Sequence, residues 1–169
     1  MKKKVFGGTL ALLLAIMATT AFAQADLGFR GAGGSLGFVD TGIGGTVGFG
    51  GLVEFGEIAP NVRLEANIDY WSKTRDLGWF GKVSASDLAL GGTVKYDLGD
   101  EDSAVRWYIG GGLGMHFVSS TSNIGMDFLG GARFGQSDSM KYFGELRYRV
   151  VSGWTQTCLR AGAVFFFGD

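Results

Sequence analysis

The chain has 169 residues, enough for one domain and hardly two. Hydrophobic residues make up 46% of it and charged residues 18%, below the usual quarter or so of a soluble domain. The formal net charge is −1, and no Lys/Arg-rich block is present, so nothing favours a nucleic-acid partner. The single cysteine, Cys158, cannot form an internal disulfide, so other interactions must hold the fold.

Residues 1–23 have the three parts of a cleaved secretory signal peptide. The basic start MKKK precedes the apolar run LALLLAIMA at 10–18, and Ala21-Phe22-Ala23 fits the A-x-A cleavage rule. The apolar run is shorter than the roughly 18 to 20 residues of a membrane-spanning helix, which argues against an anchor. We therefore expect residues 24–169 to form one exported domain that is about four charges negative, because the signal removes three lysines.

After residue 25 the recurring pattern is alternation of apolar and polar residues, as in VRLEANIDYW at 62–71. Alternation of this kind is typical of β-strands, whose successive side chains point to opposite faces. Eight such segments predict an all-β fold, an eight-stranded antiparallel up-and-down transmembrane β-barrel. We expect the strands at 27–39, 43–55, 62–71, 86–98, 105–117, 126–135, 141–151 and 156–167.

The segments between these strands alternate in length, as in up-and-down membrane barrels. Short turns are expected at 56–61, 98–104 and 135–140 on one side. The other side would carry 40–42, 72–85, 119–125 and 152–155. The longest of these, 72–85, contains Trp79 and Phe80 and is expected to be a loop that faces outward.

Alternation alone does not say which row of side chains meets water. Three observations favour an apolar row against lipid and a charged row inside: the export signal, aromatic residues at two levels, and the lack of a second sheet or helix to cover the apolar face. A soluble periplasmic barrel with a small apolar ligand would invert the faces. On the favoured hypothesis, Glu54 and Arg149 point inward, and a luminal ionic network comprises Arg63, Glu65, Asp69, Asp87, Lys95, Arg106, Asp127, Arg133, Glu145, Arg147 and Arg160.

The aromatic residues near the strand ends are expected to form a girdle at the membrane–water boundary, where amphipathic rings are favoured. In VRWYIGGGLGMHF at 105–117, Trp107 and Phe117 end one apolar row that spans about 24 Å of height when tilted, close to the apolar band of such barrels. The predicted girdle consists of Tyr70, Tyr96, Trp107, Phe117, Phe134, Tyr142 and Phe167.

In the last segment, TQTCLRAGAVFFFGD, outward residues alternate up to Phe167 near the C-terminus. With the signal, the eight alternating segments and the Gly-rich hairpins, the chain resembles the small outer-membrane barrels of the OmpA/OmpX and opacity-protein type. The resemblance implies a bacterial outer-membrane location, contact with outer-membrane lipids, and recognition of the C-terminal strand by the barrel assembly machinery. The chain departs from the family pattern in ending on Gly168-Asp169 rather than on the aromatic residue.

No catalytic, metal-binding or cofactor-binding site is expected. One cysteine and one histidine cannot make a zinc site, and no phosphate-binding loop motif occurs. Some outer-membrane barrels are lipid A deacylases or acyltransferases with a His/Ser pair at the lipid-facing rim. In the deacylases the serine follows the histidine by two residues, but here Val118 holds that place after His116, and the alternation directs His116 into the lumen.

The predicted function is that of a structural or surface-interaction protein rather than an enzyme. Eight strands enclose an interior that side chains can fill, so a diffusion pore is not expected. Two alternatives remain open: an enzyme acting on outer-membrane lipid with His116 as base, and the soluble periplasmic barrel. The surface partner is unknown.

Overall fold

The computed structural model describes residues 26–99, 103–118, 121–135, 137 and 139–167, with only the backbone described for Phe80. The expected signal peptide at 1–23 and the terminal Gly168-Asp169 lie outside the described residues. Within the described part of the chain, no helix is long and apolar enough to cross a membrane.

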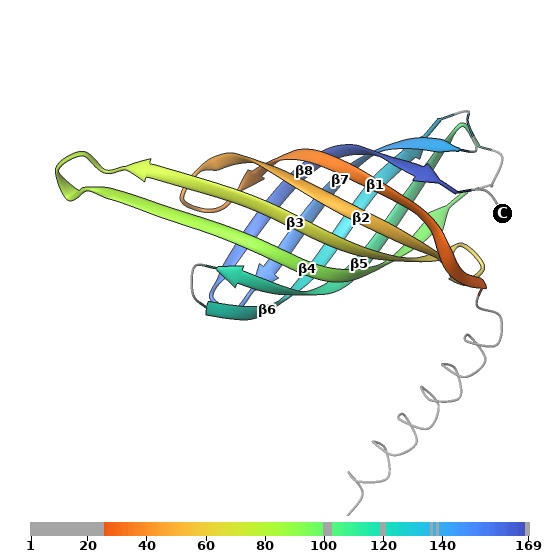
Figure 1. Ribbon diagram of the computed structural model, residues 1–169, viewed down its shortest axis with the longest axis horizontal. Coiled ribbons are helices and arrows are strands. Elements are labelled where there is room, and N and C mark those ends of the chain that lie inside the picture. The colour runs from red at the N-terminus through yellow and green to blue at the C-terminus, as the bar shows by residue number, and fades with distance from the viewer. Residues whose placement is uncertain (1–25, 100–102, 119–120, 136, 138, 168–169) are drawn as a thin grey trace, which may run out of the picture.

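Eight antiparallel strands close into a barrel in chain order, and β1 pairs with β8 (Figure 1). This architecture confirms the predicted eight-stranded up-and-down barrel. The strands are β1 (Asp26–Asp40), β2 (Gly45–Ala59), β3 (Val62–Asp76), β4 (Lys82–Leu98), β5 (Val105–Val118), β6 (Thr121–Phe134), β7 (Met140–Val151) and β8 (Trp154–Phe166). A short 3₁₀ turn, η1 (Gly78–Phe80), lies at the tip of the β3–β4 hairpin.

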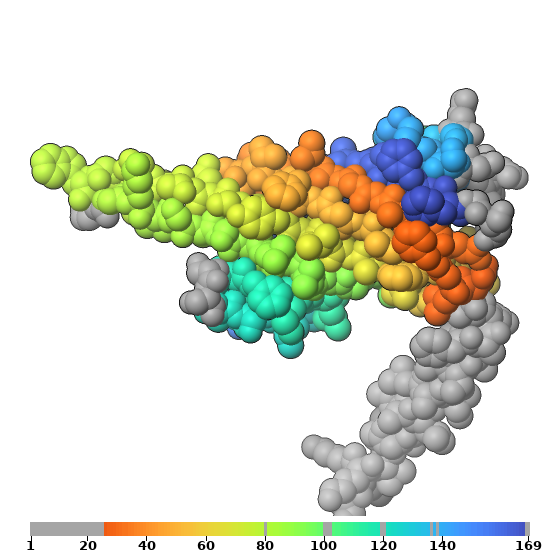
Figure 2. Space-filling model, in the orientation of Figure 1, coloured from red at the N-terminus to blue at the C-terminus, as the bar shows by residue number. Residues whose placement is uncertain are grey.

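The prediction of a loop at 72–85 is wrong. β3 and β4 continue to pair beyond Trp71 and Asp87 as far as Asp76 and Lys82, so only the tip is irregular. We call residues 72–86 the ribbon. It projects well beyond the other strands (Figures 1 and 2). On β3, Ser72–Asp76 is polar on both faces, and on β4 the apolar Val83 and Ala85 lie on the inward row instead of the outward one. The apolar outward row of a lipid-facing strand therefore stops while the backbone pairing continues.

A smaller difference of the same kind occurs at the start of β6. This strand begins at Thr121, inside the expected loop at 119–125. On the opposite side the turn expected at 56–61 is shorter than predicted, because β2 runs to Ala59 and Ala59 pairs with Val62 across a two-residue turn. Asn61 has a φ of 62° there, a left-handed conformation that asparagine tolerates better than most residues.

Glycines on the inward face make room for large side chains in the narrow barrel. A Cβ placed on Gly131 would lie 2.7 Å from the Tyr108 hydroxyl oxygen. One placed on Gly125 would lie 2.7 Å from Nε2 of His116. These glycines therefore let two bulky polar rings lie flat across the barrel interior.

Candidate functional site

The inward faces of the strands bring oppositely charged side chains together in equal numbers. All eleven residues of the predicted luminal network lie inside, as do Glu54 and Arg149. The interior ion pairs and hydrogen bonds of the described residues involve seven acids and seven bases: Glu54, Glu65, Asp69, Asp87, Asp97, Asp127 and Glu145 with Arg63, Lys95, Arg106, Arg133, Arg147, Arg149 and Arg160. Equal numbers allow the charges to compensate one another away from water.

At the end of the barrel near the short turns, two carboxylates are held by arginines. Arg63 donates to Asp97 through Nε and Nη2 and to Glu54 Oε2 through Nη1 at 3.1 Å. Arg133 also donates to Glu54, and Arg106 Nη1 lies 3.4 Å from Asp97 Oδ2. The guanidinium groups thereby connect β2, β3, β4, β5 and β6.

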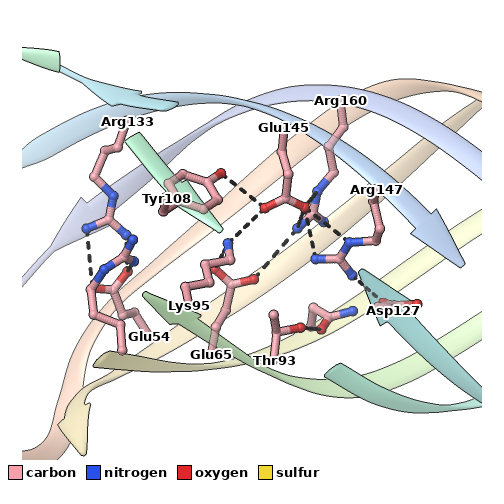
Figure 3. Close-up of polar contacts among 12 residues, drawn as sticks. Glu54, Glu65, Thr93, Lys95, Tyr108, Asp127, Arg133, Glu145, Arg147 and Arg160 are labelled. Atoms are coloured by element: carbon pink, nitrogen blue, oxygen red, sulfur yellow. Dashed lines mark hydrogen bonds and ion pairs between the residues drawn. The ribbon is translucent and has the colours of Figure 1, made fainter. Parts of the chain in front are cut away.

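Glu145 is the centre of the interior network (Figure 3). Its Oε1 accepts from Nε of Arg160 at 2.8 Å and from Nε of Arg147 at 3.1 Å. Its Oε2 accepts from the Tyr108 hydroxyl at 3.0 Å and lies 3.0 Å from Nζ of Lys95. Each carboxylate oxygen therefore has two donors, which satisfies a buried acid without water.

Towards the loop end, Asp69 and Asp127 share their arginines. Arg149 donates to Asp127 Oδ1 through Nε and to Asp69 Oδ2 through Nη2, both at 2.8 Å. Arg147 Nη1 reaches Asp127 Oδ2 at 2.9 Å, and Arg160 Nη1 reaches Asp69 Oδ1 at 3.2 Å. Because β3, β6, β7 and β8 contribute these side chains, the contacts cross the barrel and do not merely follow one hairpin.

Closer still to the loop end, Asp87 contacts a histidine and a glutamine rather than an arginine. Asp87 Oδ2 is 2.8 Å from Nδ1 of His116 and accepts from Nε2 of Gln156 at 3.1 Å. The His116 ring is 1% exposed and meets the edge of Trp154. His116 therefore lies in the lumen, as the alternation predicts, and away from the lipid-facing surface.

Little open space remains between these side chains. The cavity beside Asp69, Arg149 and Cys158 measures about 20 Å³, roughly the room for one water molecule. Cys158 is a half-buried free thiol that lines this cavity. No group of three or more His, Cys, Asp or Glu suited to a metal ion occurs among the residues that the structure describes.

The outer surface has the opposite chemistry. Leu36, Phe49, Ile109, Leu113 and Leu159 are among the many large apolar side chains that point outward and are more than half exposed. In water such a surface would be an aggregation site, whereas lipid covers it without cost.

The predicted girdle residues also lie on this outer face at two levels. Tyr70 and Phe117 both pair with Leu88, at the loop end of the barrel. Tyr96, Trp107, Phe134, Tyr142 and Phe167 lie toward the turn end, where Phe134 stacks on Tyr142 and Phe167 on Phe29.

Just beyond the aromatic residues at the loop end of the barrel, the outward-facing side chains change from apolar to polar. Along β3 it runs from Leu64 and Ile68 to Tyr70 and then to Ser72, Thr74 and Asp76. Along β4 it runs from Lys82, Ser84 and Ser86 to Leu88 and Leu90. The change occurs at the same height on both strands, so it marks the level at which the ribbon leaves the hydrocarbon.

The sequence prediction lacks two members of the interior network, Asp97 and Tyr108. Asp97 has the same parity as Lys95 and Asp87, so alternation could have found it, but it borders the acidic turn at 98–104. Tyr108 lies on the row of Arg106 and His116, and only its 3.0 Å contact with Glu145 shows that it belongs to the network.

No protein-family model matches the chain, and no curated protein matches it. Solved structures match in fold. Neisserial surface protein A (NspA) has 17% identity and a TM-score of 0.63, covering 82% of this chain and 96% of its own. The N-terminal β-barrel domain of Pseudomonas aeruginosa OprF has 13% identity and a TM-score of 0.58, covering 83% and 99%.

The attachment invasion locus protein Ail of Yersinia pestis, solved with the heparin analogue sucrose octasulfate, has 13% identity and a TM-score of 0.53, covering 82% and 97%. These likenesses concern the fold. Together with the apolar exterior, they show that this chain has the fold of the small eight-stranded β-barrels of bacterial outer membranes.

Proposed function

We propose that this chain is a structural and surface-interaction barrel, neither a diffusion pore nor an enzyme, and that the ribbon is its main binding surface. The proposal rests above all on the length of the ribbon. β3 and β4 stay paired beyond Trp71, where the pairing of β3 with β2 ends, and beyond Asp87, where the pairing of β4 with β5 ends. A paired hairpin presents its tip in a more defined position than a loop of the same length would.

The filled lumen supports the exclusion of a pore. Seven acids and seven bases occupy the interior, and the cavity found among them measures about 20 Å³. A solute would have to break several buried ion pairs to pass, and each broken pair costs about 3–5 kcal/mol.

The surroundings of His116 support a non-enzymatic function. A general base must reach the proton that it removes, but the His116 ring is enclosed, with Nδ1 on Asp87 and Nε2 against Gly125. Ser119 and Ser120, the serines near His116 in the sequence that could have completed a His/Ser pair, lie outside the described residues.

The proposed partners are outer-membrane lipids around the barrel and, during assembly, the barrel assembly machinery through β8. Outward residues of this strand alternate up to Phe165, and Phe167 continues the row. Nucleic acid is not among the proposed partners. The likeness in fold to Ail, an attachment invasion locus protein solved with a heparin analogue, supports the proposed surface-binding role.

The test compares cells that display the full barrel with cells that display a barrel whose ribbon is shortened by removing residues 73–85 and restoring a two-residue turn. Attachment is scored on surfaces coated with glycosaminoglycan, protein or lipid. We expect attachment to at least one coating to depend on the ribbon, and we expect the purified full barrel to give no steady conductance in planar bilayers. Equal attachment on every coating would refute the surface role, and a stable open channel would refute the plugged lumen.

A further inference from the structure

We propose that the tip of the ribbon inserts into an apposed lipid bilayer that carries anionic headgroups. The inference rests on the proposed function, because it names the partner of the same ribbon. Three features of the ribbon carry it: its projection away from its own membrane, the chemistry of its tip, and the charges beside the tip.

The ribbon holds its tip away from the barrel's own bilayer. Five cross-strand pairs, from Ser72–Ser86 to Asp76–Lys82, extend it about 13 Å along the strand direction. The start of β2 supports the base of the ribbon, since Thr46 Oγ1 donates to the Ser72 carbonyl at 2.8 Å and Lys73 Nζ to the Gly45 carbonyl at 2.7 Å. Figure 2 shows the ribbon continuing beyond the body of the barrel.

The tip presents apolar side chains on a backbone in which three amides are hydrogen-bonded within the tip itself. Trp79 is fully exposed, and Leu77 is also exposed. The amide of Leu77 donates to the Gly81 carbonyl at 2.8 Å, that of Gly81 to the Gly78 carbonyl at 3.1 Å, and that of Gly78 to Asp76 Oδ1 at 2.8 Å. These amides need no water, so the tip can enter a bilayer interface without leaving them unpaired.

Tryptophan is the side chain best suited to this boundary, because its ring is apolar and its indole N–H is polar. An exposed tryptophan at the end of a long paired hairpin is difficult to explain as part of a core, because nothing within the described chain covers it.

The charges beside the tip select an anionic surface. Arg75 and Lys82 are exposed one or two residues from the apolar tip, and Lys73 lies further down the ribbon. Asp76 is the only acid in 72–86, so the ribbon carries a net positive charge while the chain as a whole has a net charge of −1. Two ribbons would repel each other tip to tip, which disfavours a second copy as the partner, whereas anionic headgroups attract the cations.

The experiment uses the full barrel in nanodiscs of phosphatidylcholine, mixed with vesicles that carry brominated phosphatidylcholine with or without phosphatidylglycerol. We expect quenching of tryptophan fluorescence by the phosphatidylglycerol vesicles and co-flotation with them. Trp79→Ala should abolish the quenching. Arg75→Gln and Lys82→Gln should each weaken co-flotation about fivefold, and added salt should weaken it further.

Trp107→Phe is the matched control, since Trp107 faces the barrel's own lipid, and it should leave vesicle binding unchanged. Heat-modifiable gel mobility checks that each variant is folded. Three results would overturn the inference: no binding to phosphatidylglycerol vesicles, equal binding to phosphatidylcholine alone, or binding that survives Trp79→Ala. If vesicles fail to bind while shortening of the ribbon still abolishes attachment to a protein or glycosaminoglycan coating, the lipid partner is wrong and the surface role stands.

Discussion

Arg63 donates two parallel hydrogen bonds to Asp97, from Nε to Oδ2 and from Nη2 to Oδ1, each 2.6 Å long, and so connects β3 to β4 inside the barrel. The Asp97 side chain has no exposed surface. A bidentate arginine–carboxylate pair of this geometry is strong. Removing either residue leaves the other as a buried charge without its main partner.

Arg63→Ala should therefore lower the free energy of unfolding by about 3–5 kcal/mol, because Asp97 and Glu54 both lose a donor. The measurement is urea unfolding of the barrel folded into lipid vesicles. Arg63→Ala combined with Asp97→Ala should cost less than the sum of the two single changes, since the double variant leaves no charge of this pair unpaired. Strict additivity would show that the pair contributes no coupling.

An arginine in place of Leu113 should destabilise the barrel by about 2–4 kcal/mol, because this outward residue lies midway between Trp107 and Phe117 on β5. Val105→Arg is the matched control on the same row, below Trp107, and should cost only about 0–1 kcal/mol. Unfolding in vesicles compares the two. Similar losses at both positions would contradict a hydrocarbon environment at Leu113.

Gly131→Ala should cost about 1–3 kcal/mol through overpacking, because the added Cβ would meet the Tyr108 ring and the backbone of β7. Gly92→Ala, on the outward face of β4 with nothing within 4 Å of its Cβ position, should be nearly neutral. Thermal unfolding monitored by gel mobility distinguishes them. A neutral Gly131→Ala would mean that Tyr108 can move without loss of its bond to Glu145.

His116→Ala should leave the lipid A profile of expressing cells unchanged, because the ring is enclosed in the lumen. The same variant should lose about 1–3 kcal/mol of stability, since Asp87 keeps only Gln156 as a partner. Mass spectrometry of lipid A and vesicle unfolding give the two readouts. An altered lipid A profile would support the alternative that His116 acts as a base.

Much of the architecture follows from local pattern. Side-chain direction in a strand repeats every two residues, so the alternation in 62–71 or 105–117 assigns each residue to a face before any partner is known. Arg63, Glu65 and Arg106 are expected inside for that reason, and the structure places them there. The number and order of strands follow in the same way from the spacing of the turn segments.

The length of the ribbon does not follow from pattern. Residues 72–86 lie above the membrane, where neither face is buried, so the apolar outward row that identifies a membrane-spanning strand is missing although the pairing continues. Backbone hydrogen bonds between β3 and β4, which do not depend on side-chain polarity, extend the hairpin there.

The amino-acid sequence by itself determined which side chains share a face and that acids and bases are nearly balanced on the charged face. Only the tertiary structure decided which acid meets which base, as in the contacts of Arg149 with both Asp69 and Asp127. The physical reason is that a shift of strand register by two residues keeps every side chain on its face but changes its neighbours. Partner choice across the barrel therefore depends on register and closure, which single segments do not encode.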